Sequence, residues 1–309
     1  MLYDVLLCGD YWYDLIFTDL PGLPQLGREV LARGFDQTPG GPFIHAVAMH
    51  RLGLRVGWAA DFGNDPFSRS VIKAARREGL DESLFQCHAR PYRRITAAAS
   101  FPSDRAFLSY SDRGPEIPAP LIALAEHNAR VLMIPGLCFG PRCEEFQARA
   151  RARGMKIVMD CQCTDETLDN PAVRRALERV DVFLPNSSEA RQLTGAPNTL
   201  AALCYLGDVC SLVVIKDGPD GAHAICNGET FYAPAIPVTV VDTTGAGDAF
   251  GAGFLKAWLD GKPIAECLRW GNICGGLSTT ARGGASATPT LKEVEKWLKG
   301  KGRRMKDKG

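Results

Sequence analysis

The sequence predicts an α/β fold: a mainly parallel central sheet between two layers of helices, with a small β-strand lid. Short apolar runs alternate with helix-like segments of about 10–15 residues, a rhythm typical of βαβ units. The runs VLMI, KIVM and LVVI are continuously apolar, as expected of strands buried on both faces of a parallel sheet. A stretch without helices, residues 95–110, interrupts this rhythm and predicts the lid.

The individual elements follow from periodicity and from the residues at their ends. Residues 65–79, DPFSRSVIKAARREG, begin with Asp and end with Gly, which are helix start and stop signals. The runs AHAIC and ETFYA flank Asn227-Gly228, a pair that favours a tight hairpin turn. The other expected strands are residues 3–8, 54–60, 130–136, 155–161, 181–185 and 211–218, and the other expected helices are residues 45–53, 144–154 and 170–180.

The lid is expected to contain two strands, ITAAASF and AFLSY, joined by the turn PSDR at residues 102–105. Residues 30–35 are expected to supply a further strand. We therefore predict one domain over residues 1–298, with lid strands within about residues 12–36 and 92–113. The basic run KGKGRRMKDKG, residues 299–309, is expected to form a solvated C-terminal tail.

Composition excludes several classes of partner. Lys and Arg number 36 against 35 Asp and Glu, so the formal charge of +1 favours neither nucleic acid nor a membrane surface. The eleven cysteines contain no CxxC pair and predict reduced thiols rather than a zinc site. The start MLYDVLLCGD lacks the basic region of a signal peptide, and no apolar run reaches the ~18 residues of a membrane helix. We expect a cytoplasmic protein that acts on a small molecule.

The segment VDTTGAGDAFGAGF, residues 241–254, predicts an anion site. It follows the strand-like run PVTVV, and apolar residues recur after it at helical spacing through Leu259. Gly245, Ala246 and Gly247 would therefore lie at a helix N-terminus, where free N–H groups bind anions and glycine lets a phosphate approach. Asp248 repels an anion, which suits a general base for an incoming hydroxyl, although an acid in a first helical turn is also stabilising by itself.

This segment resembles the C-terminal signature DTxGAGD of the ribokinase-like (PfkB) family of small-molecule kinases. Four further segments are similar to other elements of that family and occur in the family's order: PGGPFIHAVAMHRLG, PNSSEARQLTG, KDGPDGA and ARGGASATP. The resemblance extends from about residue 4 to residue 298. It implies a ribokinase-like three-layer α/β/α fold and an ATP-dependent phosphotransferase that acts on a hydroxyl of a sugar or sugar-like molecule.

On the donor side, the resemblance implies that Asp248 takes the proton of the acceptor hydroxyl. The amides of Gly245 to Gly247 would form the anion hole for the transferring phosphoryl group. Asn186 and Glu189 would organise Mg²⁺ through water, although Asn-x-x-Glu at a helix start is also a capping box. The residues implied near the adenine and phosphates are Lys216, Gly218, Gly221 and Asn272, and those implied near a monovalent cation such as K⁺ are Asp242 and Thr243.

On the acceptor side, the resemblance implies that Asp14 binds acceptor hydroxyls and that Gly40 and Gly41 let the backbone approach the sugar. Many members carry asparagine where this chain has His45. A histidine facing the acceptor could donate to a hydroxyl or, as a cation, meet a negative group; otherwise it is a helix-start residue bonded to backbone. The aromatic residues 11–13 would either stack on a sugar or base or pack in the core.

Three alternatives stay open from the sequence. A nucleoside kinase would use the same scaffold and motifs. A non-catalytic sugar- or nucleotide-binding protein would need no base at residue 248. The lid permits a homodimer and is equally compatible with a monomer.

Overall fold

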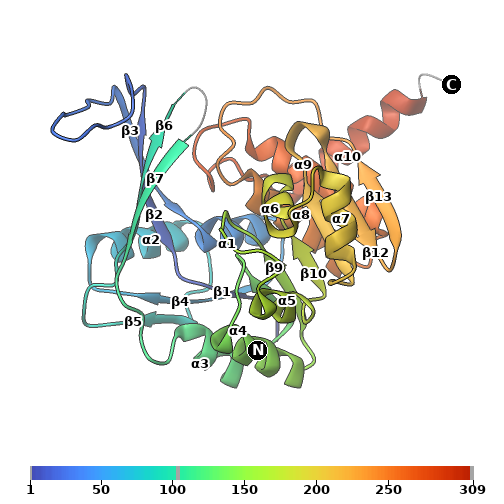
Figure 1. Cartoon of the computed structure of the whole chain (residues 1–309), viewed down its shortest axis with the longest axis horizontal. Helices are drawn as coiled ribbons and strands as arrows, with labels where there is room; N and C mark the ends of the chain where they lie inside the picture. The colour runs from blue at the N-terminus through green and yellow to red at the C-terminus, as the bar shows by residue number, and fades with distance from the viewer. Residues whose placement is uncertain (1, 102–104, 307–309) are drawn as a thin grey trace.

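The computed structural model describes residues 2–101 and 105–306 and confirms the predicted α/β architecture. A nine-stranded sheet forms the body, helices cover both of its faces, and a separate four-stranded sheet projects from one end as the lid (Figure 1). Among the described residues, no helix is both long and apolar enough to cross a membrane. All eleven cysteines are free thiols.

The body sheet is parallel through seven strands and ends in an antiparallel hairpin. Its strand order is β13-β12-β11-β10-β9-β8-β1-β4-β5, with β12 antiparallel to both of its neighbours. The strands are β1 (Leu2–Cys8), β4 (Val56–Phe62), β5 (Phe85–Cys87), β8 (Asn128–Ile134), β9 (Lys156–Asp160), β10 (Val182–Leu184), β11 (Leu212–Lys216), β12 (Ala222–Cys226) and β13 (Glu229–Ala233). Because parallel strands point the same way, the carboxyl ends of β9, β10 and β11 meet at one edge of the sheet, where ligands bind in open α/β folds.

Two helical layers bury the two faces of this sheet in separate apolar clusters. The first layer consists of α1 (Pro42–Arg51), α2 (Pro66–Arg77), α8 (Ala246–Leu259), α9 (Ile264–Ser278) and α10 (Leu291–Lys306). The second consists of α3 (Ala119–Glu126), α4 (Pro141–Ala152), α5 (Pro171–Leu177), α6 (Ser187–Thr194) and α7 (Thr199–Gly207). Strand side chains alternate between the clusters: Leu7 faces the first layer and Leu6 the second, and both are fully buried.

The lid sheet has the order β3-β2-β6-β7. Its strands are β2 (Trp12–Thr18), β3 (Gly34–Gly40), β6 (Arg94–Ser100) and β7 (Arg105–Ser111). The predicted strands of the β6–β7 pair are confirmed, whereas residues 102–104 of the predicted PSDR turn lie outside the described residues. The strand expected at residues 30–35 was placed too early, because the antiparallel register with β2 runs from Thr18–Gly34 to Trp12–Gly40.

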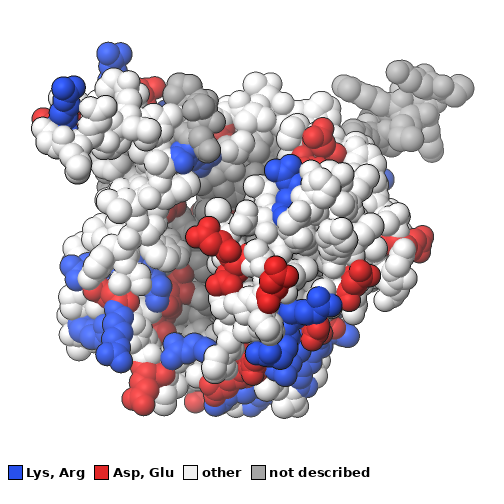
Figure 2. All heavy atoms as spheres, viewed as in Figure 1, with Lys and Arg blue, Asp and Glu red and all other residues white. Residues whose placement is uncertain are grey.

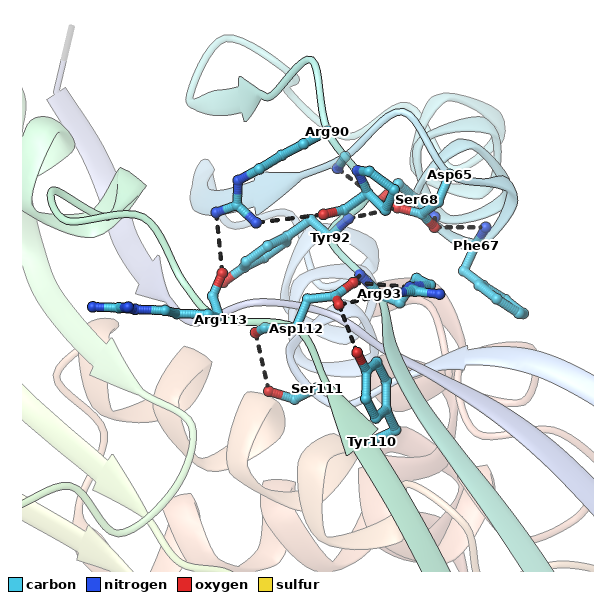
Figure 3. Close-up of polar contacts among 12 residues, drawn as sticks. Asp65, Phe67, Ser68, Arg90, Tyr92, Arg93, Tyr110, Ser111, Asp112 and Arg113 are labelled. Atoms are coloured by element: carbon cyan, nitrogen blue, oxygen red, sulfur yellow. Dashed lines mark hydrogen bonds and ion pairs between the residues drawn. The ribbon is translucent and has the colours of Figure 1, made fainter.

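Polar contacts tie the base of the lid to α2 (Figure 3). Arg93, just before β6, donates through its backbone and side chain to Asp112, just after β7, at 2.7–3.1 Å. The carboxylate of Asp65 caps α2 through the amides of Phe67 and Ser68 and also accepts the amide of Tyr92 at 2.9 Å. These hydrogen bonds therefore hold the ends of β6 and β7 in place next to α2.

Three further expectations differ from the structure. The strand-like residues 237–241 form no strand; they follow the edge strand β13, and their end is bonded to α9 through Val241 N and the Thr279 carbonyl. Helix α1 begins at Pro42, three residues before the expected start, because proline suits the first helical position. Helix α10 spans Leu291–Lys306, so the boundary predicted at residue 298 falls inside a helix.

Candidate active site

Three neighbouring strands deliver polar groups to the same edge of the sheet. Asp160 is the last residue of β9, Lys216 is the last residue of β11, and Asn186 follows β10 between them. Asn186 and Lys216 also form a parallel bridge that extends the sheet by one step. The topology thus places the Asn-x-x-Glu segment beside the lysine of the KDGPDGA segment.

Helix α8 brings the glycine motif to this edge. Gly245 is its N-cap with φ 74°, a left-handed conformation that favours glycine, and a Cβ there would lie 3.0 Å from the Gly284 carbonyl oxygen. Asp242 fixes the preceding turn, since its carboxylate accepts the Thr244 amide at 2.9 Å and the Gly283 amide at 3.1 Å. The first turn of α8 therefore begins at a fixed turn of the chain: the Ala246 amide donates to the Thr243 carbonyl at 3.2 Å, and Asp248 lies in the first helical turn.

A cavity of about 600 Å³ opens directly onto this helix start. Its lining brings together the predicted donor residues Lys216, Gly218, Gly221, Thr243, Ala246, Gly247 and Asn272. Ile236, Val238, Val240 and Phe250 supply apolar walls. The Asn272 amide donates to the Ala233 and Pro234 carbonyls at 2.9 and 3.1 Å, so it holds the pocket wall in place.

Lys216, which lines this cavity, lies beside the turn at residues 242–247, called the anion loop below. A Cβ added to Gly247 would lie 3.4 Å from the ammonium nitrogen of Lys216. A phosphate held by the α8 amides would therefore also meet a cation there. A second cavity of about 930 Å³, between α9, α10 and residues 286–290, contains none of the predicted site residues.

Asn186 and Glu189 form the capping box of α6. The Asn186 side chain accepts the Glu189 amide at 2.9 Å, and the Glu189 carboxylate accepts the Asn186 amide at 2.8 Å. Burial raises the pKa of Glu189, while the Lys216 charge opposes that rise. Carboxylate and amide oxygens suit Mg²⁺, and the cap leaves one oxygen of Glu189 for such a role.

A chain of ionisable side chains runs from the cavity to Asp248. Lys216 Nζ lies 2.6 Å from Asp160 Oδ1, Asp160 Oδ2 lies 3.4 Å from His45 Nε2, and His45 Nδ1 lies 3.5 Å from Asp248 Oδ1. The Asp160 and His45 side chains are almost fully buried, whereas a quarter of the Asp248 side chain is exposed. The candidate base is thus the solvent-facing end of a buried ionic chain.

Burial and mutual attraction shift the pKa values along this chain. Burial raises the pKa of Asp248, and the nearby His45 opposes the rise. Burial alone would raise the pKa of Asp160 and lower that of Lys216, but their contact lowers the first and raises the second. Asp160 is therefore held as a carboxylate and Lys216 as an ammonium ion.

The predicted acceptor residues meet at the junction of lid and body. The Asp14 carboxylate lies over Gly40, where a Cβ would come 2.2 Å from Asp14 Oδ2, and a Cβ on Gly41 would come 2.9 Å from Trp12 Cδ1. Both glycines therefore make room for side chains of β2. Burial, together with the negative charge of Asp248, raises the pKa of Asp14 to about 6.

Two of the three aromatic residues at this junction belong to the core. Tyr11 is fully buried, stacks on Phe62 and donates to the Tyr92 carbonyl at 2.6 Å. Tyr13 is also buried, against Phe67. Of this aromatic run, Trp12 alone is partly exposed, and the Arg94 guanidinium lies over its ring, 5.8 Å from the ring centroid.

Sequence reasoning missed Asp160 and Arg105. The signal for Asp160 was an acid ending the otherwise apolar strand run KIVMD. Arg105, at the start of β7, donates to the hydroxyls of Thr244 and Thr243 at 2.7 and 2.8 Å, so it joins the lid to the anion loop. No local pattern predicts that contact, because it joins residues 138 and 139 positions apart.

The hollow between lid and body is visible on the molecular surface, with acidic side chains around it (Figure 2). Across this space the site offers a carboxylate base, helix-start amides and a lysine, which together suit transfer of a phosphoryl group to a hydroxyl.

Known proteins are similar to this chain in sequence and in fold. The profile of the pfkB family carbohydrate kinases matches residues 4–291. The 5-dehydro-2-deoxygluconokinase of Shouchella clausii strain KSM-K16 is 27% identical over 85% of this chain and 87% of its own length. The aminoimidazole riboside kinase of Salmonella typhimurium is 28% identical over 84% of this chain and 88% of its own.

Among solved structures, the ribokinase of Arabidopsis thaliana complexed with ribose and ATP superposes with a TM-score of 0.82 at 22% identity. The match covers 97% of this chain and 99% of that one. The predicted ribokinase-like fold is confirmed.

Proposed function

Because this chain belongs to the pfkB family of carbohydrate kinases, a family of phosphotransferases that act on sugar hydroxyls, we propose how its own residues divide that reaction. ATP donates its γ-phosphoryl group to a hydroxyl of a sugar or sugar-like acceptor, and Asp248 takes the hydroxyl proton. The observation that carries the proposal is the position of Asp248 in the first turn of α8, directly after Gly245 to Gly247 and at the end of the ionic chain.

The donor half of the proposal rests on the cavity beside α8. Its apolar walls suit a nucleobase, and Lys216 beside Gly247 suits the phosphates. The amides at the start of α8, where a helix leaves N–H groups without intrahelical partners, would stabilise the charge of the transferring group. The Ala246 amide, which donates to the Thr243 carbonyl at 3.2 Å, would exchange that partner for the phosphate. ATP is the expected donor on these grounds.

Glu189 and Asn186 would hold Mg²⁺ through water on the donor side. Bound Mg²⁺ supplies neutralisation of phosphate charge. The raised pKa of Glu189 and its one oxygen outside the capping box are consistent with a site that a cation completes. Asp242 and Thr243 would lie near a K⁺ ion. The Arg105 guanidinium, 3.8 Å from the Asp242 carboxylate and bonded to the Thr243 hydroxyl, is a cation that already contacts both residues.

The acceptor half of the proposal rests on Asp14. This residue lies at the junction of lid and body, and the negative charge of Asp248 contributes to its raised pKa. Asp14 accepts hydrogen bonds from acceptor hydroxyls, and one of these hydroxyls reaches Asp248. Gly40 and Gly41, which make room for the side chains of Asp14 and Trp12, let these side chains lie beside the acceptor. His45 belongs to this side of the site because its Nδ1 lies 3.5 Å from Asp248 Oδ1.

A nucleoside is the second candidate acceptor. The similarity to an aminoimidazole riboside kinase favours it, and the exposed part of Trp12 offers a surface for a base. The core positions of Tyr11 and Tyr13 leave less aromatic surface for such an acceptor than the sequence suggested. A sugar is therefore the first choice. A non-catalytic binding protein is disfavoured because binding alone needs no carboxylate at an anion site.

The lid carries a candidate dimer surface. Phe35, Leu108 and Tyr110 are more than half exposed on one face of its sheet, and Phe107 is similarly exposed on the opposite face. A second copy of the chain would cover such a surface. A cytoplasmic location is consistent with eleven free thiols.

A coupled assay of ADP release with Mg·ATP tests the proposed function. The acceptors are ribose, fructose, keto-deoxy sugar acids, inositol and nucleosides, each with and without enzyme. We expect release with one class of sugar or nucleoside. Release with none of them, at enzyme concentrations that bind ATP, would contradict the proposal.

A further inference from the structure

His45 is a buried imidazole between two carboxylates. Its Nε2 lies 3.4 Å from Asp160 and its Nδ1 lies 3.5 Å from Asp248, and only 3% of the residue is exposed. Nδ1 makes no other polar contact among the described residues and points at Asp248. A neutral imidazole carries one N–H only and would leave one of these carboxylates facing a ring nitrogen lone pair.

The charges around His45 come from five elements. Asp248 on α8 and Asp160 on β9 flank the ring, Lys216 on β11 pairs with Asp160, Asp14 on β2 interacts with Asp248, and Glu189 on α6 interacts with Lys216. Four carboxylates therefore share one ammonium ion. Buried negative charge without a counter-charge is costly, so a second cation in this cluster stabilises it.

We propose that His45 is an imidazolium bridge that positions the catalytic base: both ring N–H groups donate, one to Asp160 and one to Asp248. This inference rests on the proposed role of Asp248. Asp160, fixed by Lys216, anchors one side of the ring, and the other side holds the Asp248 carboxylate ionised and oriented. His45 acts through Asp248 and does not itself take the acceptor proton, because both of its nitrogens already carry one.

The direction of the electrostatics agrees with this geometry. Burial alone would lower the pKa of His45, but the charges of Asp248 and Asp160 raise it above its ordinary value. In turn, His45 lowers the pKa of Asp248 against the effect of burial. Loss of the cation should therefore raise the pKa of the base.

Protonation of the ring can be measured without any activity. Long-range ¹H–¹⁵N spectra of the whole chain report the state of each of its five histidines. His45→Asn or His45→Gln, whichever folds, identifies the His45 signals by their absence. We expect both ring nitrogens to be protonated at pH 7.5 and the titration midpoint to fall in Asp160→Asn. A single neutral tautomer at pH 7.5 in the native chain would overturn the proposal.

The pH profile of kcat/KM gives the second readout, with the acceptor found by the ADP-release screen. In His45→Asn we expect the acidic limb to move to higher pH by about one unit and kcat to fall roughly 10–100-fold. His88→Asn is the matched control, because it breaks another histidine–carboxylate pair, 2.7 Å from Asp61, outside the cluster. It should keep the native profile.

The two readouts separate the two proposals. An unchanged profile in His45→Asn means that the ring does not act on the base, and the bridge is then wrong. If no acceptor gives ADP release, the proposed function fails, while the ring spectra still decide whether His45 is an imidazolium ion.

Discussion

The ammonium nitrogen of Lys216 lies 2.6 Å from a carboxylate oxygen of Asp160, and both side chains are withdrawn from solvent. The two residues end strands β11 and β9, with β10 between them, so the sheet itself fixes their separation. Lys216 also lines the proposed nucleotide cavity beside Gly247. Under the proposed function, one cation would therefore serve both the fold and the phosphate end of the site.

Removing this cation should destabilise the protein through Asp160. In Lys216→Met the buried carboxylate loses its nearer partner and keeps only the His45 ring, and we expect a loss of about 3–5 kcal/mol in the free energy of unfolding. The double variant Lys216→Met/Asp160→Asn removes both charges and should recover most of that loss. Urea denaturation measures both. A double variant as unstable as the single one would show that lost packing, rather than an unpaired charge, is the cause.

Replacing the candidate base should abolish turnover and leave the fold intact. We expect Asp248→Asn to lower kcat about 10²–10⁴-fold, because the amide cannot take the acceptor proton. Asp260→Asn, at the end of the same helix, is the control, since that side chain only pairs with Lys256 at the surface. Kinetics and circular dichroism of both variants provide the comparison. Near-native turnover of Asp248→Asn would exclude this residue as the base.

The capping box of α6 allows its structural and metal roles to be separated. Asn186→Ala should cost about 1 kcal/mol of stability because the Glu189 amide loses its acceptor. It should also raise the Mg²⁺ concentration needed for half-maximal activity. Asn198→Ala removes a similar cap, the one that accepts the Ala201 amide at 2.9 Å at the start of α7. It should cost as much stability without changing the Mg²⁺ requirement. An equal Mg²⁺ response in both variants would leave Asn186 with the cap alone.

The fold was largely predictable because its signals are local. Apolar strand runs, the Asp65 cap and the Asn227-Gly228 turn each act within a few residues, and the corresponding elements formed near the expected positions. The wrong predictions concern segments whose structure depends on whether a neighbouring strand pairs with them, and in which register. Residues 237–241 have a strand-like composition but leave an edge strand without a neighbour, and β3 takes its register from β2.

The site was predictable only where a motif repeats a known pattern. The cavity gathers Lys216, Gly218, Gly221 and Asn272 as the resemblance implied. Asp160 and Arg105 belong to no such motif, and their roles depend on side chains brought together from distant positions. The conformation of His45 likewise depends on two carboxylates more than 100 residues away in sequence.

Asp14 should make stability depend on pH in an unusual direction. Its pKa of about 6 lies above the ordinary value of a carboxyl group, so the folded state binds a proton more tightly than the unfolded state. Stability should therefore fall as pH rises from about 4 through 6, and at pH 8 the buried carboxylate should cost about 3 kcal/mol. Asp14→Asn should be more stable than the native chain at pH 8 and similar at pH 4.5, as measured by urea denaturation. Asp36→Asn, exposed on β3, should change neither value. A constant difference between Asp14→Asn and the native chain across this range would contradict the assignment.

The two glycines inside α8 should respond oppositely to alanine. A Cβ on Gly253 would lie 2.6 Å from Cys274 Sγ and 2.8 Å from the Trp270 carbonyl oxygen, so α9 can pack closely only against glycine. A Cβ on Gly251 would meet no atom closer than Leu184 Cδ1 at 3.6 Å. Gly253→Ala should therefore lose about 1–3 kcal/mol through overpacking, whereas Gly251→Ala should gain up to ~1 kcal/mol of helix propensity. Thermal unfolding of the pair provides the measurement. If Gly253→Ala is as stable as Gly251→Ala, close packing of α8 on α9 does not explain that glycine.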